Sequence, residues 1–370
     1  MPRRHYGVHF GGGHPDPHVL GRPIVVLVLE TAVLASLLSS SAAGEGASGV
    51  LPRLTAGSFF TEWSLDPLPL IITVWGAGLY LVGVASLRRR GDKWPVGRTL
   101  AFVVAGMGSF YVATSSGLAT YDTTVLSVHM VQHMILSMLV PLSLALGAPV
   151  TLALRTLPAV PRRWLLAVLH SRIAKVFSFP PLTFTLYIVS PWALYFSGWY
   201  RASLESTYVH EAMHVHLVVV GALFFWPLMG IDPIPGRVGY PFRVLLTVLT
   251  LPFHAFLGVT IMGQTTLIGG DWYPRLSDGP MGAWLPDPLD DQNLAGGILW
   301  GSGDLIGLVF FGVLFTQWVR SSMKEAQRED RRLDRLERIE AREQALAHQA
   351  APSTASSTAS GDGPARPADG

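Results

Sequence analysis

The feature that most constrains this chain is a series of long apolar runs with almost no charge. Each has about the 20 residues that a helix needs to cross roughly 30 Å of hydrocarbon. Because the runs are uninterrupted and are not amphipathic stripes, they predict an all-α integral membrane protein. The bundle would have seven transmembrane helices, at residues 68–87, 98–119, 124–147, 180–198, 208–230, 241–267 and 294–319.

A further hydrophobic segment precedes these seven and could be an anchor or a signal. It runs from Pro23 to Ala43, follows several arginines and ends in the small-residue run "SSSAAGEGASG". That ending is typical of a signal peptide. The long preceding tail and the interruption by Glu30 favour an uncleaved membrane anchor.

Lysine and arginine alternate between successive connections, which predicts the orientation of the bundle. They concentrate in the connections at 88–98 and 150–178 and in the tail from Arg320. The alternate connections, at 120–123, 199–207 and 268–293, are predicted to lie outside and carry seven acids, Asp122 and Asp291 among them, whereas their only basic residues are Arg201 and Arg275. Since basic loops stay in the cytoplasm, we expect a multi-pass cell-membrane protein with a cytoplasmic C-terminus.

Charge and composition also divide the rest of the chain. Residues 160–178 mix basic and apolar side chains at helical spacing, which predicts an amphipathic helix at the cytoplasmic interface. The last residues are too poor in apolar side chains to fold. The expected organisation is an N-terminal extension with the hydrophobic segment (1–50), the seven-span domain (60–320), a charged cytoplasmic helix (321–348) and a disordered tail (349–370).

Histidines inside the predicted spans are the strongest functional signal. His129 and His133 lie four residues apart in one span, and His210 and His214 repeat that spacing in another. Residues at i and i+4 share a helix face. An ionisable side chain in hydrocarbon costs a few kcal/mol and usually faces the bundle interior to serve a site. We therefore predict a metal site in the outer half of the membrane, with ligands from His129, His133, His210, His214, His216 and His254.

The available donors favour copper. The chain has no cysteine, so thiolate sites and disulfides are excluded. Imidazole suits zinc, copper and iron, and thioether sulfur shifts the preference toward Cu(I). Zinc stays possible, and a haem b held by two histidines is a further alternative. The candidate thioethers are Met130, Met134, Met138, Met213 and Met262.

Other polar features leave the function open between classes. Asp304, inside the last span, could be a ligand, a proton relay or a partner of a histidine. His5, His9, His14 and His18 form a histidine-rich tail that would lie opposite the site. No nucleotide-binding loop or hydrolase elbow is visible, which indicates a protein that is not an enzyme. A haem-binding electron-transfer protein and a metal- or proton-coupled transporter remain alternatives.

Three stretches resemble a known family. They are "VHMVQHMILSMLVPLSLALGAPVTLALR" at Val128–Arg155, "YVHEAMHVHLVVVGALFFWPLMGIDP" at Tyr208–Pro233 and "LPFHAFLGVTIM" at Leu251–Met262. Together they are similar to the CtaG-type multi-span cytochrome c oxidase assembly proteins associated with caa-type oxidases. The resemblance covers about residues 60–320 and leaves out both termini.

The resemblance implies a seven-span bundle that is needed to produce active cytochrome c oxidase, by handling copper for one of its copper centres. The residues that carry over are the six histidines named above. The implied partners are oxidase subunits and the lipid bilayer, and no nucleic acid is expected.

Overall fold

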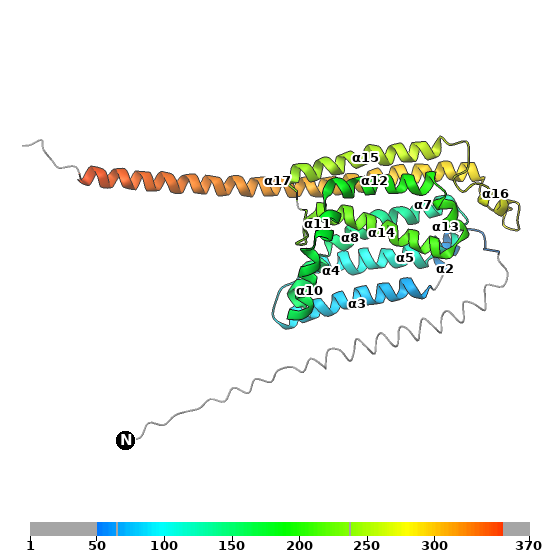
Figure 1. The fold of residues 1–370 in the computed structure, drawn as a ribbon, viewed down its shortest axis with the longest axis horizontal. Coiled ribbons are helices and arrows are strands. Elements are labelled where there is room, and N and C mark those ends of the chain that lie inside the picture. The colour runs from blue at the N-terminus through cyan, green and yellow to red at the C-terminus, as the bar shows by residue number, and fades with distance from the viewer. Residues whose placement is uncertain (1–49, 64–65, 237, 351–370) are drawn as a thin grey trace, which may run out of the picture. The chain divides into compact units, whose positions relative to one another are not determined.

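The computed structural model describes residues 50–63, 66–236 and 238–350, and within these the chain is helical without strands (Figure 1). The predicted anchor or signal segment, the N-terminal histidines and the tail after residue 350 lie outside the described residues. The chain divides into two units, Met1–Leu314 and Phe315–Gly370. Each unit is described by itself, and the predicted domain boundaries remain predictions.

The first unit contains short and long helices and the first part of α17. In chain order they are α2 (Ala56–Thr61), α3 (Pro67–Arg89), α4 (Val96–Leu100), η1 (Ala101–Gly108), α5 (Ser109–Ser115), α6 (Gly117–Tyr121), α7 (Leu126–Met134), η2 (Ile135–Leu139), α8 (Val140–Leu146), α9 (Pro149–Thr156), α10 (Ala159–Leu169), α11 (Arg172–Phe177), α12 (Pro180–Phe196), α13 (Trp199–Glu205), α14 (Thr207–Met229), α15 (Tyr240–Met262), α16 (Trp272–Ser277) and α17 (Pro288–Ala350). The segments η1 and η2 are π-helical.

Six helical segments of the described chain are long and apolar enough to cross a membrane, which confirms six of the seven predicted runs. They are Pro67–Arg89, Val96–Tyr121, Leu126–Thr156, Thr207–Met229, Tyr240–Met262 and Pro288–Leu346. The seventh run forms α12, which has only 17 residues. It begins at Pro180 and ends at Phe196, because the next residue, Ser197, is extended. Since α12 is short for a membrane-spanning helix, the count of seven spans is not confirmed.

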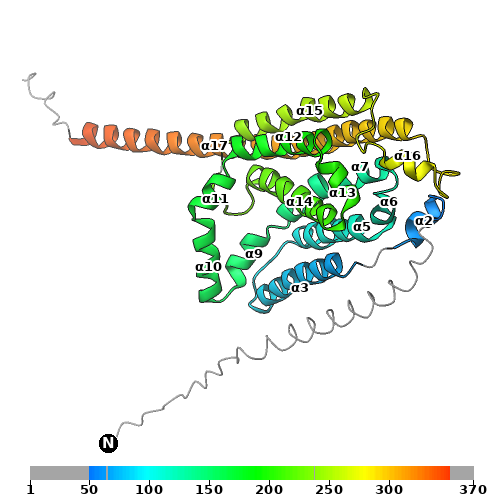
Figure 2. The same cartoon turned by 45° about the vertical axis from the view of Figure 1, so that its right-hand side comes forward.

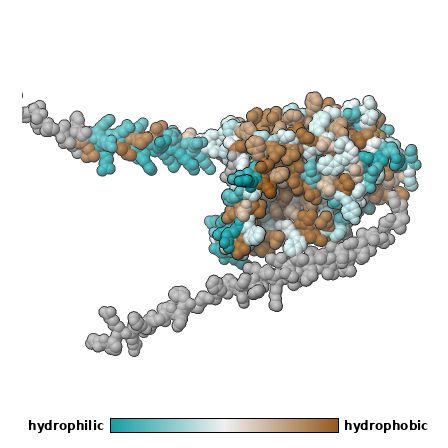
Figure 3. Space-filling view, in the orientation of Figure 1, coloured by the Kyte–Doolittle hydropathy of each residue, from teal (hydrophilic) through white to brown (hydrophobic). Residues whose placement is uncertain are grey.

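Short helices gather at the two ends of the first unit. Figure 1 shows α2, α13 and α16 toward one end, and Figure 2 shows α9, α10 and α11 toward the other. On the face seen in Figure 3, hydrophobic residues form a broad band between hydrophilic patches at these ends. Large apolar side chains such as Val104 and Phe256 are exposed along the long helices. This distribution is typical of helices surrounded by lipid.

The single amphipathic helix predicted for residues 160–178 is wrong. The chain forms two helices there, α10 and α11, separated at His170 and Ser171. The hydroxyl of Ser171 accepts a hydrogen bond from the backbone N–H of Ala174 at 3.0 Å and so begins the second helix. Both helices keep exposed apolar side chains, including Trp164 and Ile173.

The two helices that carry the histidine pairs pack closely. A Cβ atom at Gly221 of α14 would collide with the backbone carbonyl oxygen of Ser137 in η2. Only glycine therefore permits this approach. The π-helical turn lies at the same point, directly after α7, and such turns often mark functional positions. This contact brings the first half of α14 beside α7.

The start of α7 is fixed by a distant carboxylate. Val125 precedes the helix and provides no side-chain cap. Instead, Asp291 in the first turn of α17 accepts hydrogen bonds from the backbone N–H groups of Leu126, at 2.6 Å, and Ser127, at 3.3 Å. Asp291 is buried, although its sequence position suggested an outer loop. A negative charge is favourable at a helix N-terminus.

A second buried carboxylate organises the opposite end. Asp232 accepts hydrogen bonds from the backbone N–H groups of Val150 and Thr151, at 3.2 and 2.7 Å, and from the hydroxyl of Thr151 at 2.6 Å. The indole N–H of Trp226 is a fourth donor, at 3.0 Å. The motifs "GAP" and "WPLxGxDP" therefore meet in space, with Asp232 capping α9.

In the second unit, α17 continues as a helix to Ala350. Nearly all of the side chains described between Phe315 and Leu346 are exposed or only partly buried. Residues 321–348 are thus helical, but they form the end of a helix that begins at Pro288.

Candidate metal centre

Three buried side chains converge between the loop after α6 and the first half of α14. They are Asp122, His210 and His214, called the acidic cluster below. Each offers one ligand atom, and these atoms all lie within 4.8 Å of one another. Their exposed fractions are 2%, 7% and 5%. A buried carboxylate beside two imidazoles is a donor set that holds zinc, copper or iron in proteins.

The two histidines share one face of α14, as their spacing predicts. Their ring centroids are 4.5 Å apart. Nε2 of His210 lies 2.8 Å from Oδ2 of Asp122, and Nε2 of His214 lies 3.8 Å from the same oxygen. The carboxylate is thus close to one imidazole and within reach of the other.

Gln132 of α7 positions the second imidazole. Its amide nitrogen donates to the backbone carbonyl of Ala113 at 2.9 Å, which turns its Oε1 toward His214. That oxygen lies 3.1 Å from Nε2 of His214, so Nε2 is the donor here. An ion bound at Nε2 would replace this hydrogen bond. Gln132 is 0% exposed, so its orientation is fixed by these partners.

The side chain of His129 lies beside the acidic cluster without any hydrogen bond. It is 0% exposed, and neither ring nitrogen has a partner among the described residues. Its ring centroid is 6.3 Å from that of His210 and 6.4 Å from that of His133. A buried polar group without a partner is costly, and an absent ion is one of the accepted explanations. The arrangement therefore fits a bound metal.

His133, one turn along α7, has a different environment. Its Nδ1 lies 2.5 Å from the hydroxyl of Tyr195 in α12. That hydroxyl is also 3.5 Å from Sδ of Met130. All three side chains are buried.

The structure does not bring His216 and His254 into the acidic cluster. Nε2 of His216 pairs with the hydroxyl of Ser190 at 2.5 Å. Nδ1 of His254 donates to the backbone carbonyl of Thr250 at 3.2 Å. Both contacts are ordinary helix-to-helix or local hydrogen bonds. The predicted set of six ligands is therefore spread over several places, and metal binding by any member stays a prediction.

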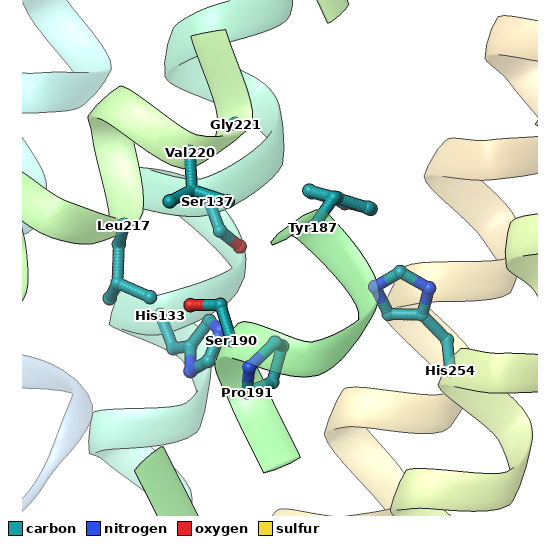
Figure 4. A pocket seen from close by; sticks show the side chains of 9 residues that line it. All are labelled: His133, Ser137, Tyr187, Ser190, Pro191, Leu217, Val220, Gly221 and His254. Carbon is teal, nitrogen blue, oxygen red and sulfur yellow. The ribbon is translucent and has the colours of Figure 1, made fainter. Parts of the chain in front are cut away.

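A small cavity separates His133 from His254 (Figure 4). It measures about 10 Å³, which is of the order of one water molecule. Ser137, Tyr187 and Ser190 also line it. Figure 4 shows His254 on the opposite side from His133. Such a space has no room for a porphyrin.

Two tyrosines cover the histidines at the end where α13 and α16 lie. The hydroxyls of Tyr200 and Tyr273 are 2.6 Å apart, and the ring of Tyr200 lies 5.0 Å from that of His129. Burial raises the pKa of both phenols above the usual value, so they stay protonated at neutral pH. A neutral, hydrogen-bonded pair excludes water from the histidines beneath it.

Sequence reasoning missed Asp122, Gln132 and Tyr195 as site residues. Asp122 had been assigned only to an acidic outer loop, although its place directly before the first histidine pair was a usable signal. The predicted thioethers Met130, Met134, Met138 and Met213 are all buried. Asp304 accepts from the indole N–H of Trp300 at 2.8 Å, and its Oδ1 has no partner among the residues described.

Comparisons with known proteins agree with these motifs. Residues 78–321 match the family described as cytochrome c oxidase caa3 assembly factor. Uncharacterized proteins of Mycobacterium bovis and Mycobacterium tuberculosis are each 39% identical over 287 residues, which is 76% of this chain and 43% of the relative. One from Mycobacterium leprae is 38% identical over 284 residues, or 75% of this chain and 42% of its own length.

The chain therefore spans less than half the length of these relatives. No solved structure matches it. The family match includes all six predicted histidine ligands and most of the membrane-spanning helices. This chain belongs to the family of cytochrome c oxidase caa3 assembly factors.

Proposed function

We propose that this protein helps to assemble cytochrome c oxidase by holding copper in the acidic cluster and delivering it to the oxidase. The observation that carries this proposal is the convergence of Asp122, His210 and His214, all buried and within 4.8 Å through their ligand atoms. His129 supports it, because both of its buried nitrogens lack a partner. Family membership supplies the oxidase as the partner.

The proposed orientation places the acidic cluster near the outer surface of the cell membrane. The basic connections would be cytoplasmic, together with the C-terminus. In this arrangement α12 is a seventh span, because 17 residues are at the lower limit for crossing the hydrocarbon. Oxidase subunits could then receive the ion laterally from within the bilayer.

The donor set supports copper over the two alternatives. Imidazole and carboxylate alone suit zinc equally well, but Met130, which follows His129 in α7, adds a buried thioether. Haem b would need a large space between facing histidines, and the cavity beside His133 and His254 holds about 10 Å³. A few exchangeable ligands suit delivery better than a closed site does. The proposed role is therefore carriage of the metal and not catalysis.

Metal analysis of the purified full chain tests this proposal. The protein, loaded with copper, zinc or iron salts and freed of excess metal, should retain copper in stoichiometric amount. The variant His214→Ala should lose the copper held in the acidic cluster, because it removes one ligand of that cluster. His170→Ala is the matched control, since His170 is exposed and its Nδ1 only contacts the Leu166 carbonyl. A copper content that is unchanged in His214→Ala would contradict the proposal.

The same preparation distinguishes the alternatives. A Soret absorption band would indicate haem b. Stoichiometric zinc in place of copper would indicate a zinc site. Metal or proton flux in liposomes would indicate a transporter.

A further inference from the structure

A second group of buried donors lies along α7, apart from the acidic cluster. It consists of Met130, His133 and Tyr195, called the thioether cluster below. The Tyr195 hydroxyl lies 2.5 Å from Nδ1 of His133 and 3.5 Å from Sδ of Met130. The exposed fractions of these residues are 0%, 3% and 2%. Three polar or polarisable atoms from two helices thus meet in the interior.

One of the two separations matches a bound ion, whereas the 2.5 Å between the Tyr195 hydroxyl and Nδ1 of His133 is a hydrogen bond, which an ion would replace. Ligands bound tetrahedrally at about 2.0–2.3 Å from one ion lie about 3.3–3.8 Å apart. The sulfur–oxygen separation in the thioether cluster, 3.5 Å, falls in that range. The Tyr195 hydroxyl contacts both the imidazole of His133 and the thioether of Met130. An ion bound at this point would be within reach of both side chains.

The two clusters differ in chemistry. The acidic cluster contains a carboxylate, which suits borderline and harder ions. The thioether cluster replaces it with sulfur, a soft ligand that selects Cu(I). No carboxylate forms a hydrogen bond or ion pair with these three residues in the described part of the chain. The thioether cluster is therefore the better site for a cuprous ion.

His129 lies between the two clusters and is the natural link. It precedes His133 by one turn of α7, and its ring is about equally far from His133 and from His210. Two imidazole nitrogens that share an ion at about 2.0 Å each lie at most about 4 Å apart. Ring centroids near 6.4 Å leave only a small side-chain movement to reach that separation. Both of its nitrogens are without partners, so no hydrogen bond must be broken.

We propose that Met130, His133 and Tyr195 form a second copper site, selective for Cu(I), and that His129 passes the ion between the two clusters. This inference rests on the proposed function of the acidic cluster. The transfer is ligand exchange: a bond from His129 to copper forms as one from the acidic cluster breaks, and His133 then replaces His129. The ion stays Cu(I) throughout, so no electron donor or acceptor is needed.

Anaerobic titration of the purified full chain with Cu(I), in competition with bicinchoninate, tests the second site. The unaltered protein should bind two equivalents, and X-ray absorption at the copper edge should show sulfur bound to part of the copper. Met130→Leu should bind one equivalent and show no sulfur. Met229→Leu is the matched control, because Met229 of α14 is a similarly buried thioether that is not among the candidate ligands. It should retain both equivalents and the sulfur.

Several results would overturn the second site. Copper without sulfur in the unaltered protein does so independently of whether any variant folds. Sulfur that persists in Met130→Leu does so as well. Asp122→Asn separates this inference from the proposed function, since it should remove the other equivalent and leave the copper bound to sulfur. If Asp122→Asn loses nothing, the acidic cluster is wrong as a copper site.

The role of His129 has its own readout. After one equivalent of Cu(I) is added, the sulfur contribution should grow with time as the ion moves to the thioether cluster. His129→Phe should reach the same final state more slowly. An unchanged time course would overturn the linking role of His129.

Discussion

Two buried aspartates near opposite ends of α14 show how the same side chain can be structural or functional. Asp232 follows the C-terminal end of α14 and receives four hydrogen bonds from Val150, Thr151 and Trp226. Asp122 lies beside the N-terminal half of α14, close to His210 and His214. The donors named around Asp232 are backbone N–H groups, a hydroxyl and an indole, and none of them is an imidazole. Around Asp122 they are imidazoles that can exchange a proton for a metal.

The two aspartates differ in whether the polar groups around them all have hydrogen-bond partners. Beside Asp122, both ring nitrogens of His129 and the Nδ1 atoms of His210 and His214 have no hydrogen-bond partner among the described residues, although Nδ1 of His214 lies 3.8 Å from a carboxylate oxygen of Glu211. The four donors that surround Asp232 all have a partner in its carboxylate. Buried polar groups are normally satisfied, so the leftover nitrogens indicate the site and the satisfied carboxylate indicates the scaffold.

The largest expected effect is on copper affinity at the acidic cluster. Replacing both histidines, His210→Ala with His214→Ala, should weaken copper binding by about 1,000-fold or more, because even partners of ligands are worth about 10- to 100-fold. Competition titration measures this change. If the double variant binds copper as tightly as the unaltered protein does, the surroundings of Asp122 are not a copper site, and the contrast with Asp232 is wrong.

The next largest effect is on the free energy of unfolding and concerns Asp232, near the C-terminal end of α14. Asp232→Ala should lower the free energy of unfolding by about 3 kcal/mol, since it leaves buried N–H groups of α9 and Trp226 unsatisfied. Asp122→Ala should cost only about 1 kcal/mol, since it removes a single close partner. Unfolding of both variants in detergent gives the comparison. Equal losses would remove the distinction between scaffold and site.

Hydropathy and histidine spacing carried most of what could be predicted from the sequence. A membrane span needs apolar residues along its whole length, so it leaves a long apolar run in the sequence. Six of the seven predicted runs form helices long and apolar enough to cross a membrane. The pairing of His210 with His214 is local to one helix and followed from their spacing. The break at His170 and the short length of α12 depend on single residues that interrupt an otherwise regular pattern.

Contacts between distant segments could not be predicted in this way. Asp122 lies 88 residues from His210, and Tyr195 lies 62 from His133. Nothing in a hydropathy pattern states which helices become neighbours. The six histidines were grouped into one predicted site because the sequence predicts their depth in the membrane but not their lateral positions. The close approach at Gly221 determines that position.

A smaller change should follow from loosening the imidazole of His214. Gln132→Leu removes the oxygen that holds its Nε2, so copper affinity should fall by about 10- to 100-fold. The control is Gln292→Leu, which removes an equally buried glutamine that bonds only the loop at Thr266 and Ile268. This control should leave copper affinity unchanged. Equal effects of the two variants would indicate a general loss of structure.

The smallest expected effect concerns the cap of α7. Asp291→Ala should lower the free energy of unfolding by about 1 kcal/mol, the usual value for a lost helix cap. Thermal unfolding with and without copper measures it. The exposed cap at Asp287, which bonds the N–H groups of Leu289 and Asp290, is the matched control and should matter less. A larger loss at Asp287 would show that burial of the cap is unimportant.

The most direct test of the central claim is anomalous diffraction at the copper edge from crystals of the full chain loaded with copper. We predict an anomalous peak between the carboxylate of Asp122 and the imidazoles of His210 and His214, about 2.0–2.2 Å from each ligand atom. No peak is expected beside Asp232. A copper-loaded crystal with no peak at the acidic cluster would contradict the account.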